Sequence, residues 1–116
     1  MNKIIKLLLF ILFFSINIQA QHNNLVMANT LFSEGKYSAS QALFQQLIIN
    51  ERANETANYY NAKCSKELFA SDAVFLYEQF LNTFPYSSFI PHVNRDLALL
   101  YYRDLDYPKA IKYFLQ

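Results

Sequence analysis

Side chains that perform acid–base or metal chemistry are few in this chain of 116 residues, and they are far apart. The only histidines are His22 and His92, and neither stands at metal-ligand spacing from an aspartate or glutamate. His92 follows Pro91 in the expected first turn of a helix, which predicts a surface position. Asp104 and Asp106 flank a predicted turn, where carboxylates commonly cap helix ends. The sequence therefore predicts no enzyme, no metal site and no cofactor.

Cysteine and glycine occur once each, which excludes further kinds of site. Cys64 is the single cysteine, so the chain can form neither an intramolecular disulfide nor a cysteine metal cluster. It falls on the inner side of a predicted helix, and we expect a buried, inert thiol there. Gly35 is the single glycine, which excludes a glycine-rich phosphate loop.

The first twenty residues have the organisation of a secretory signal peptide. Lys3 and Lys6 give a positive start, residues 7–14 are an uninterrupted apolar run, and the small residue Ala20 marks a cleavage point. The apolar run is short for a transmembrane helix, which needs about 20 apolar residues. We therefore predict a signal peptide over residues 1–20, with an uncleaved membrane anchor as the alternative.

Removal of this segment leaves a nearly neutral protein. Of the ten lysines and arginines two leave with the signal, so eight remain against nine acidic residues, a formal net charge of −1. Binding to nucleic acid needs clustered basic residues, and binding to anionic lipid needs a polybasic segment. We predict no nucleic-acid partner.

Apolar side chains recur three and four residues apart through residues 24–116, which predicts an all-α protein. The helices form three predicted hairpins, at about residues 24–50, 55–84 and 91–116. Gly35 is expected to end the first helix, which begins near Asn24, and Ser38 to cap the second. Pro85 and Pro91 bound the longest link, since the residue before a proline is pushed out of helical geometry.

A short pattern of small and aromatic residues occurs once in each hairpin. Phe44, Tyr77 and Phe114 are its aromatic members, separated by 33 and 37 residues. A period near 34 residues with helical spacing indicates stacked helical hairpins, which bind other macromolecules more often than they catalyse reactions. The other members of the pattern are Leu47, Ala73, Phe80, Pro85 and Ala110.

From about Leu25 to its end the chain resembles the tetratricopeptide repeat (TPR). The residues that carry the resemblance are 28–37 with Phe44, then Ala73, Tyr77, Phe80 and Pro85, then 98–102 with Tyr107, Ala110 and Phe114. The segments Phe84-Pro85-Tyr86-Ser87 and Leu99-Leu100-Tyr101-Tyr102 are similar to repeats of bacterial envelope proteins. Those proteins include the lipoprotein of the β-barrel assembly machine, the periplasmic coordinator of the Tol-Pal system and long TPR proteins of the Bacteroidetes envelope. Leu105 departs from the family, which has glycine there.

The resemblance implies a right-handed solenoid of about three repeats, the last incomplete, with a partner-binding groove lined by the first helix of each hairpin. The groove positions of the family fall on Asn29, Ser33, Asn58, Ala62, Ser65, Lys66, Arg95, Leu99, Tyr102 and Arg103. An extended peptide would bind there, with Lys66, Arg95 and Arg103 pairing with its carboxylates. The alternative is a solvated face, or one that contacts the next part of the same chain.

These expectations describe an exported scaffold or adaptor of the bacterial envelope, periplasmic or associated with the outer membrane. Its expected partner is a protein or peptide, with no direct small-molecule substrate, and its oligomeric state stays open. The apolar stripe that includes Phe114 and Leu115 predicts that residues 21–116 are the N-terminal part of a longer protein. Two alternatives remain: a segment packed permanently in a larger envelope assembly, or the accessory module of an enzyme whose catalytic part lies beyond Gln116.

Overall fold

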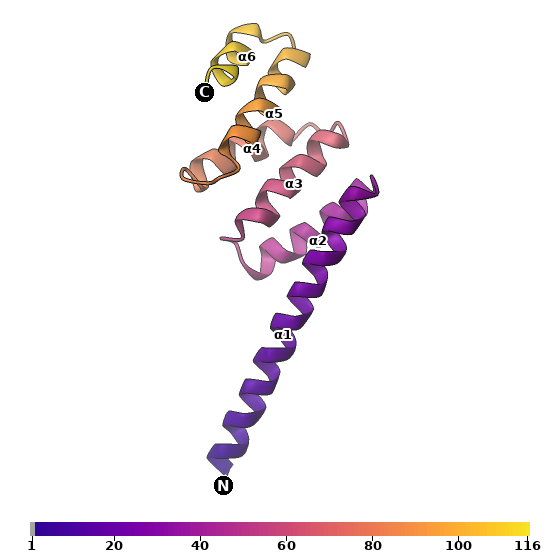
Figure 1. The fold of residues 1–116 in the computed structure, drawn as a ribbon, viewed down its shortest axis with the longest axis vertical. Coiled ribbons are helices and arrows are strands. Elements are labelled where there is room, and N and C mark those ends of the chain that lie inside the picture. Colours follow the sequence, from indigo (N-terminus) through magenta and orange to yellow (C-terminus); the bar gives the residue numbers. More distant parts are fainter. Residues whose placement is uncertain (1) are drawn as a thin grey trace.

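The computed structural model describes residues 2–116, and within them it contains six helices and no strand. This confirms the all-α class. The helices are connected by short turns and lie one after another along the molecule (Figure 1). Their bounds are α1 Asn2–Ser33, α2 Tyr37–Asn50, α3 Glu55–Glu67, α4 Ala73–Thr83, α5 Ile90–Arg103 and α6 Tyr107–Phe114.

Helix α1 is much longer than the sequence pattern predicts, because it starts at Asn2 and not near Asn24. No glycine or proline lies between these positions to interrupt it, so the apolar N-terminal segment continues into the first hairpin as one helix of 32 residues. Its first half projects away from the other helices and exposes its apolar side chains (Figure 1). By length and composition this helix suits either a signal sequence or a membrane span.

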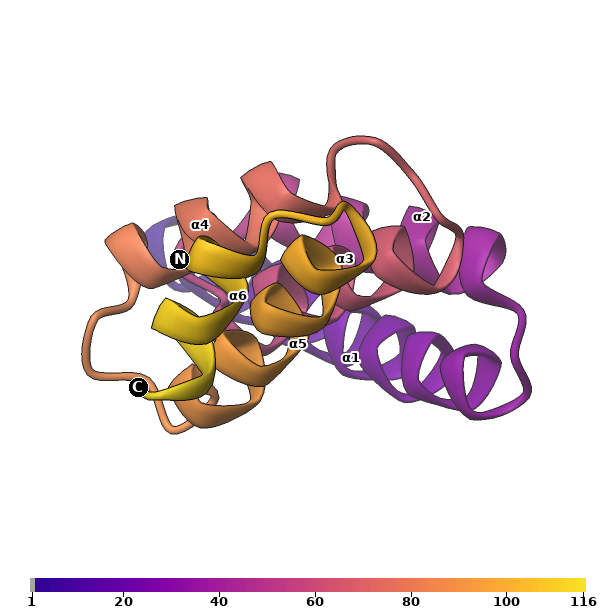
Figure 2. The same cartoon turned by 90° about the horizontal axis from the view of Figure 1, so that it is seen from above.

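Each helix packs against the one that follows it, from α1 on α2 to α5 on α6. Figure 2 shows the stacked helices from above, along the long axis of the molecule. The buried core divides into two clusters. One is centred on Ala28, Phe44 and Cys64 of the first three helices, and the other on Tyr77 and Leu97 of α4 and α5, with neighbours from α3 and α6.

The first helix of every hairpin ends in the same turn. Gly35, Phe69 and Leu105 have φ angles of 76°, 54° and 64°. The backbone N–H of each donates to the carbonyl three residues earlier, and the next N–H donates to the carbonyl five residues before it. This is the Schellman motif, in which a left-handed residue closes a helix and satisfies its last carbonyls. The sequence also predicts the turn between Asp104 and Asp106, but only Gly35 has the residue type that favours a positive φ.

The three turns define a structural register for the repeat. Ala28, Ala62 and Ala98 each stand seven residues before the left-handed residue of their hairpin, and all three are fully buried. The left-handed residues are 34 and 36 positions apart. The small alanine lets two helices approach closely, so the same position is small in every hairpin.

Three helix starts have a capping side chain or a first-turn proline. The side chains of Asn54 and Asp106 accept backbone hydrogen bonds at the starts of α3 and α6, and Pro91 lies in the first turn of α5. The predicted cap at Ser38 is wrong, because α2 already begins at Tyr37, and its N-cap residue makes no side-chain hydrogen bond. Lys36 takes the N-cap position of α2 that Asp106 takes in α6, but a lysine side chain has no oxygen that could accept a backbone N–H.

Candidate functional site

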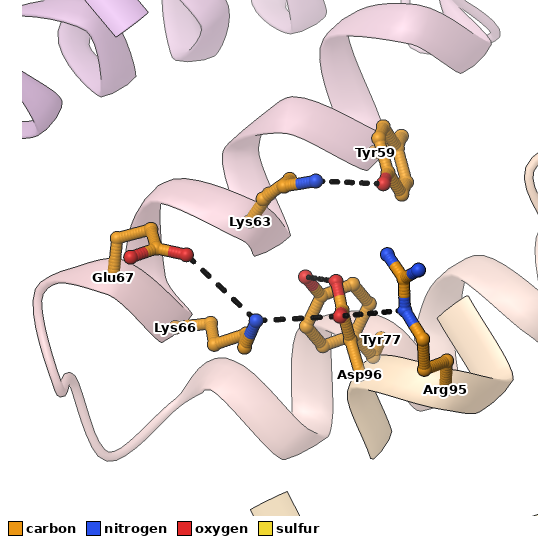
Figure 3. A network of polar contacts seen from close by, with 7 residues as sticks. All are labelled: Tyr59, Lys63, Lys66, Glu67, Tyr77, Arg95 and Asp96. Atoms are coloured by element: carbon orange, nitrogen blue, oxygen red, sulfur yellow. Dashed lines mark hydrogen bonds and ion pairs between the residues drawn. The ribbon is translucent and has the colours of Figure 1, made fainter. Parts of the chain in front are cut away.

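A buried carboxylate, that of Asp96, lies between the second and third hairpins. Only 2% of its side chain is exposed. The Tyr77 hydroxyl of α4 donates a hydrogen bond of 2.8 Å to Asp96 Oδ2, and Lys66 Nζ of α3 donates one of 3.3 Å to Oδ1. Arg95 Nε is 3.9 Å from the same oxygen, and these side chains converge in Figure 3. Asp96 thus joins both helices of the second hairpin to α5.

The charges of this cluster balance. Glu67 Oε1 lies 3.7 Å from Lys66 Nζ, so two carboxylates face two cations. Burial raises the pKa of the Tyr77 phenol far above its usual range, and the Asp96 charge raises it further, so this tyrosine stays a hydrogen-bond donor. Solvent barely reaches the Asp96 carboxylate, so this carboxylate acts by fixing the positions of Lys66 and Arg95.

A second tyrosine, Tyr59 of α3, lies beside this cluster. Burial raises the pKa of Tyr59 to about 12, and the Asp96 charge contributes to the increase. Lys63 Nζ donates a hydrogen bond of 3.3 Å to the Tyr59 hydroxyl (Figure 3). The Tyr59 ring also stacks on Phe89 at 4.2 Å between centroids. Aromatic and ionic contacts therefore meet at the same junction of α3 with α5.

The cations predicted for carboxylate binding differ in how available they are. Lys66 is bound to buried Asp96, whereas Arg95 and Arg103 have exposed side chains. The Arg103 guanidinium lies 5.3 Å from the centre of the Phe69 ring, at the turn that follows α3. Tyr102 is exposed and lies beside Tyr107, with 5.6 Å between ring centroids. We name the surface formed by Lys63, Arg95, Leu99, Tyr102 and Arg103 the α3–α5 face.

Two of the predicted groove residues point elsewhere. Ser65 is buried, and its hydroxyl accepts a hydrogen bond of 2.7 Å from Gln41 of α2. Asn58 is half-buried and donates to the backbone oxygens of Arg52 and Asn54 in the link before α3. Their side chains therefore support the α2–α3 contact and do not lie on the α3–α5 face.

The register of the turns explains this placement. When the first two hairpins are aligned on their aromatic residues, Asn61 is equivalent to Ala28. When they are aligned on their left-handed residues, Ala62 is equivalent to Ala28. The left-handed residue precedes the aromatic member of the pattern by eight residues in the second hairpin, from Phe69 to Tyr77, and by nine in the other two, so the two alignments differ by one residue on α3. Under the structural register Ala62 is a buried packing residue and Lys63 replaces it on the surface.

The groove residues of the first hairpin lie on α1. Asn29 and Ser33 are both exposed. The Ser33 hydroxyl donates to the Thr30 carbonyl of its own helix. The neighbouring Phe32 ring contacts Tyr60 of α3, with centroids 5.1 Å apart, so this end of α1 adjoins α3.

Cys64 and His92 lie where the sequence predicts them. Cys64 is fully buried, and burial raises the pKa of its thiol, which disfavours the reactive thiolate. His22 and His92 are both exposed. Residues 2–116 contain no group of three side chains that could hold a metal ion.

Asp96 is the residue that the sequence reasoning missed. The sequence did contain an indication that Asp96 is buried. Asp96 falls three residues after Val93 and four before Leu100, so it lies within the apolar stripe of its helix. An acidic residue inside such a stripe must find a cation or a donor when the helix packs. Which partners it would find depends on the neighbouring helices.

Comparison with known proteins adds no relative to this picture. No protein-family model matches the chain, and no match is found among curated proteins.

Proposed function

We propose that this protein is an exported, TPR-like scaffold of the bacterial envelope, whose hairpins stack as a right-handed solenoid. In this proposal a protein or peptide partner binds the α3–α5 face. The observation that supports it best is the threefold recurrence of one unit: a helix with a buried alanine, a Schellman turn seven residues later, and a second helix. Units of this kind bury their apolar faces on one another and leave one side free.

The composition of the α3–α5 face favours a partner with carboxylates. Arg95 and Arg103 have exposed side chains, and Tyr102, next to Arg103 in the sequence, has an exposed ring. Arginine and tyrosine are enriched in protein interfaces, because each combines apolar contact area with hydrogen bonding. Lys66 contributes less, since its ammonium group already binds Asp96.

The test is charge reversal that leaves this internal contact intact. We expect Arg95→Glu combined with Arg103→Glu to reduce capture of the partner from native envelope extract at least tenfold, because repulsion replaces pairing. Lys66 is left unchanged, since its loss would also break the buried contact. Lys109→Glu with Lys112→Glu on α6 is the matched control, and it should retain capture.

Helical content, measured by circular dichroism, should be equal in the two double variants. If both of them capture the partner as well as the wild type does, the assignment of the α3–α5 face is incorrect. If both lose capture equally, net charge and not this face determines binding.

Export is part of the same proposal. Cleavage after Ala20 would leave residues 21–33 of α1, a helix of thirteen residues, which equals the thirteen residues of α3. The signal segment would thus be removed without loss of the part that packs on α2.

The permanently packed segment remains a second candidate, favoured by the outer side of α6. Ile111, Phe114 and Leu115 are all exposed there, and such an apolar patch suits an obligate contact. Salt distinguishes the two functions: a partner held by the α3–α5 face should dissociate between 0.1 M and 1 M NaCl, whereas apolar packing should persist.

A further inference from the structure

The first and last helices of the stack each pack mainly on one neighbour. α1 lies on α2 and α6 lies on α5, at opposite ends of the molecule (Figure 1). Both ends have apolar side chains that are more than half exposed. In the part of α1 that remains after the proposed cleavage these are Val26 and Met27, and at α6 they are Ile111, Phe114 and Leu115. We call these two sets, with the partly exposed Leu31 of α1, the α1 end surface and the α6 end surface.

The position of Phe114 on α6 is buried in the other two hairpins. Phe44 and Tyr77, the aromatic residues to which Phe114 corresponds, are fully buried on α2 and α4. The first helix of the next hairpin covers each of them. The Tyr60 ring of α3 stacks on Phe44 with 5.3 Å between centroids, and Asp96 of α5 accepts the hydrogen bond of Tyr77. Phe114 therefore lies on the side of its helix against which a first helix packs.

The position of Val26 on α1 corresponds to the two residues that make these contacts. Val26 stands nine residues before the left-handed residue of its hairpin, and so do Tyr60 and Asp96 in theirs. Met27, one position further, corresponds in the same register to Leu97, which is fully buried on α5. Val26 and Met27 therefore lie on the side with which a first helix packs on the hairpin before it.

The two end surfaces match each other in chemistry. At the junction of α4 with α5 the contact is polar, since Tyr77 donates to Asp96. The corresponding residues at the ends are both apolar, because Phe114 lacks the hydroxyl and Val26 lacks the carboxylate. An aspartate packed on Phe114 would lose this hydroxyl donor, so Phe114 favours a helix with an apolar residue at this position. Of the three first helices, α1 is the one that has an aliphatic residue there.

A second polar contact changes in the same way. At the junction of α2 with α3, Gln41 donates its hydrogen bond of 2.7 Å to the Ser65 hydroxyl. Gln41 lies three residues before Phe44, and the residue at this place on α6 is Ile111. Ser65 lies four residues before its left-handed residue, and the residue at this place on α1 is Leu31. Polar partners are thus replaced by apolar ones on both sides, as expected for two surfaces that pack on each other.

We propose that the α6 end surface binds the α1 end surface of a second copy of this chain, so that successive copies continue the helix stack head to tail. In this contact Phe114 of one copy packs on Val26 of the next, and Ile111 packs on Leu31. The contact is heterologous, because the two copies use different surfaces, so each added copy brings one free end for another. It does not involve the α3–α5 face, which stays free for the proposed partner.

Two single variants of the full chain test the two ends separately. Val26→Glu removes the α1 end surface and Phe114→Glu removes the α6 end surface, and each variant keeps the other end. Sedimentation equilibrium in a density-matched detergent reports the protein mass alone. We expect the wild type to form species larger than a dimer as its concentration rises, and each variant alone to stay a monomer, because packing would bury an unpaired glutamate. An equimolar mixture of the two variants has one intact contact and should form a dimer and nothing larger.

Phe75→Glu is the matched control, since Phe75 is an exposed aromatic residue of α4 outside both end surfaces, and it should associate as the wild type does. The double variant Arg95→Glu/Arg103→Glu should also associate normally, so that loss of partner capture and loss of self-association are separate results. Helical content by circular dichroism should be equal in all variants. If a glutamate variant loses helicity, the neutral variants Val26→Asn and Phe114→Asn replace the glutamate pair in the mixture.

Three results would overturn the proposal. A wild-type chain that stays monomeric at every concentration would show that the end surfaces are covered by another protein and not by a second copy. A dimer of Val26→Glu alone, or of Phe114→Glu alone, would show that two like ends pair. A mixture of the two variants that stays monomeric would show that the α1 and α6 end surfaces do not bind each other.

Discussion

At the residue scale, Asp96 determines how the cations around it can act. It holds Lys66 at the junction of α3 and α5 and leaves Arg95 on the surface beside it. A buried carboxylate with several donors contributes little net stability compared with an apolar residue, but its loss leaves the partners unpaired. The same contact therefore stabilises the junction and sets the shape of the α3–α5 face.

Replacement of the carboxylate should measure this contact. We expect Asp96→Asn to lower the free energy of unfolding by about 3 kcal/mol, because the Lys66 ammonium group loses its buried partner. Urea unfolding followed by circular dichroism gives the value. The exposed pair Lys109–Asp106 provides the control, and Lys109→Ala should change the free energy by less than about 1 kcal/mol. Equal effects of the two substitutions would show that Asp96 is not buried as described.

Buried tyrosines predict a loss of stability at alkaline pH. Tyrosine in an unfolded chain titrates near pH 10, whereas Tyr59 titrates at about 12 and the pKa of Tyr77 is raised still further. Between pH 10 and 12 the folded state therefore holds more protons than the unfolded state, so stability is complete below pH 10 and falls as pH rises. The expected slope is about 1.4 kcal/mol per pH unit for each such tyrosine.

The Tyr77→Phe variant should have a shallower slope by that amount when unfolding is measured at several pH values. Tyr86 is 99% exposed, so Tyr86→Phe should leave the slope unchanged. A slope in Tyr77→Phe that equals that of the wild type would assign the effect to other groups.

At the element scale, the three Schellman turns are alike in backbone but not in sequence. Gly35 takes its positive φ without strain, but Phe69 and Leu105 are large residues in the left-handed region. The side chain of Leu105 is mostly exposed, so packing does not compensate for the strain. Phe69 has the Arg103 guanidinium over its ring, which gives its side chain a contact that glycine would lack.

Glycine at the third turn should therefore stabilise the protein. We expect Leu105→Gly to raise the free energy of unfolding by about 1 kcal/mol, since the left-handed conformation costs a leucine roughly that much. The neighbouring Asp104 has a φ of −84°, and Asp104→Gly should instead destabilise, because it only adds freedom to the unfolded chain. A thermal melt of each variant decides between them, and a lower melting temperature for Leu105→Gly would contradict the strain argument.

At the scale of the whole molecule, the outcome of signal processing determines where α1 begins. Expressed with its native N-terminus in a Gram-negative host, the protein should be recovered without residues 1–20, with Gln21 at its start, as measured by intact mass. The Ala20→Leu variant should keep the segment, since cleavage needs a small residue at that point. Circular dichroism of the processed chain should be predominantly helical. Recovery of the uncut wild-type chain in the membrane fraction would favour the anchor.

The α-helical class and most helix ends were predictable, because they depend on local chemistry. The spacing of apolar residues predicts the helices, Gly35 predicts the first turn, and Pro85, Pro91 and Asp106 mark three boundaries. Each of these signals acts through the conformation of one residue or through neighbours within one helical turn. No contact with a distant part of the chain is needed to interpret them.

What the tertiary structure decided is how these helices face one another. The turn at Phe69 lies eight residues before Tyr77, one fewer than in the other hairpins, so the fold places Ala62 in the core and Lys63 nearer the surface. Asp96 finds Lys66 and Tyr77 on two other helices, and the Oδ1 atom of Asn61 is buried without a donor among the described residues. The sequence by itself determined which segments are helical, because that depends on local backbone preference. Only packing determined which side chains are paired, since the partners lie on different helices and are brought together by the fold.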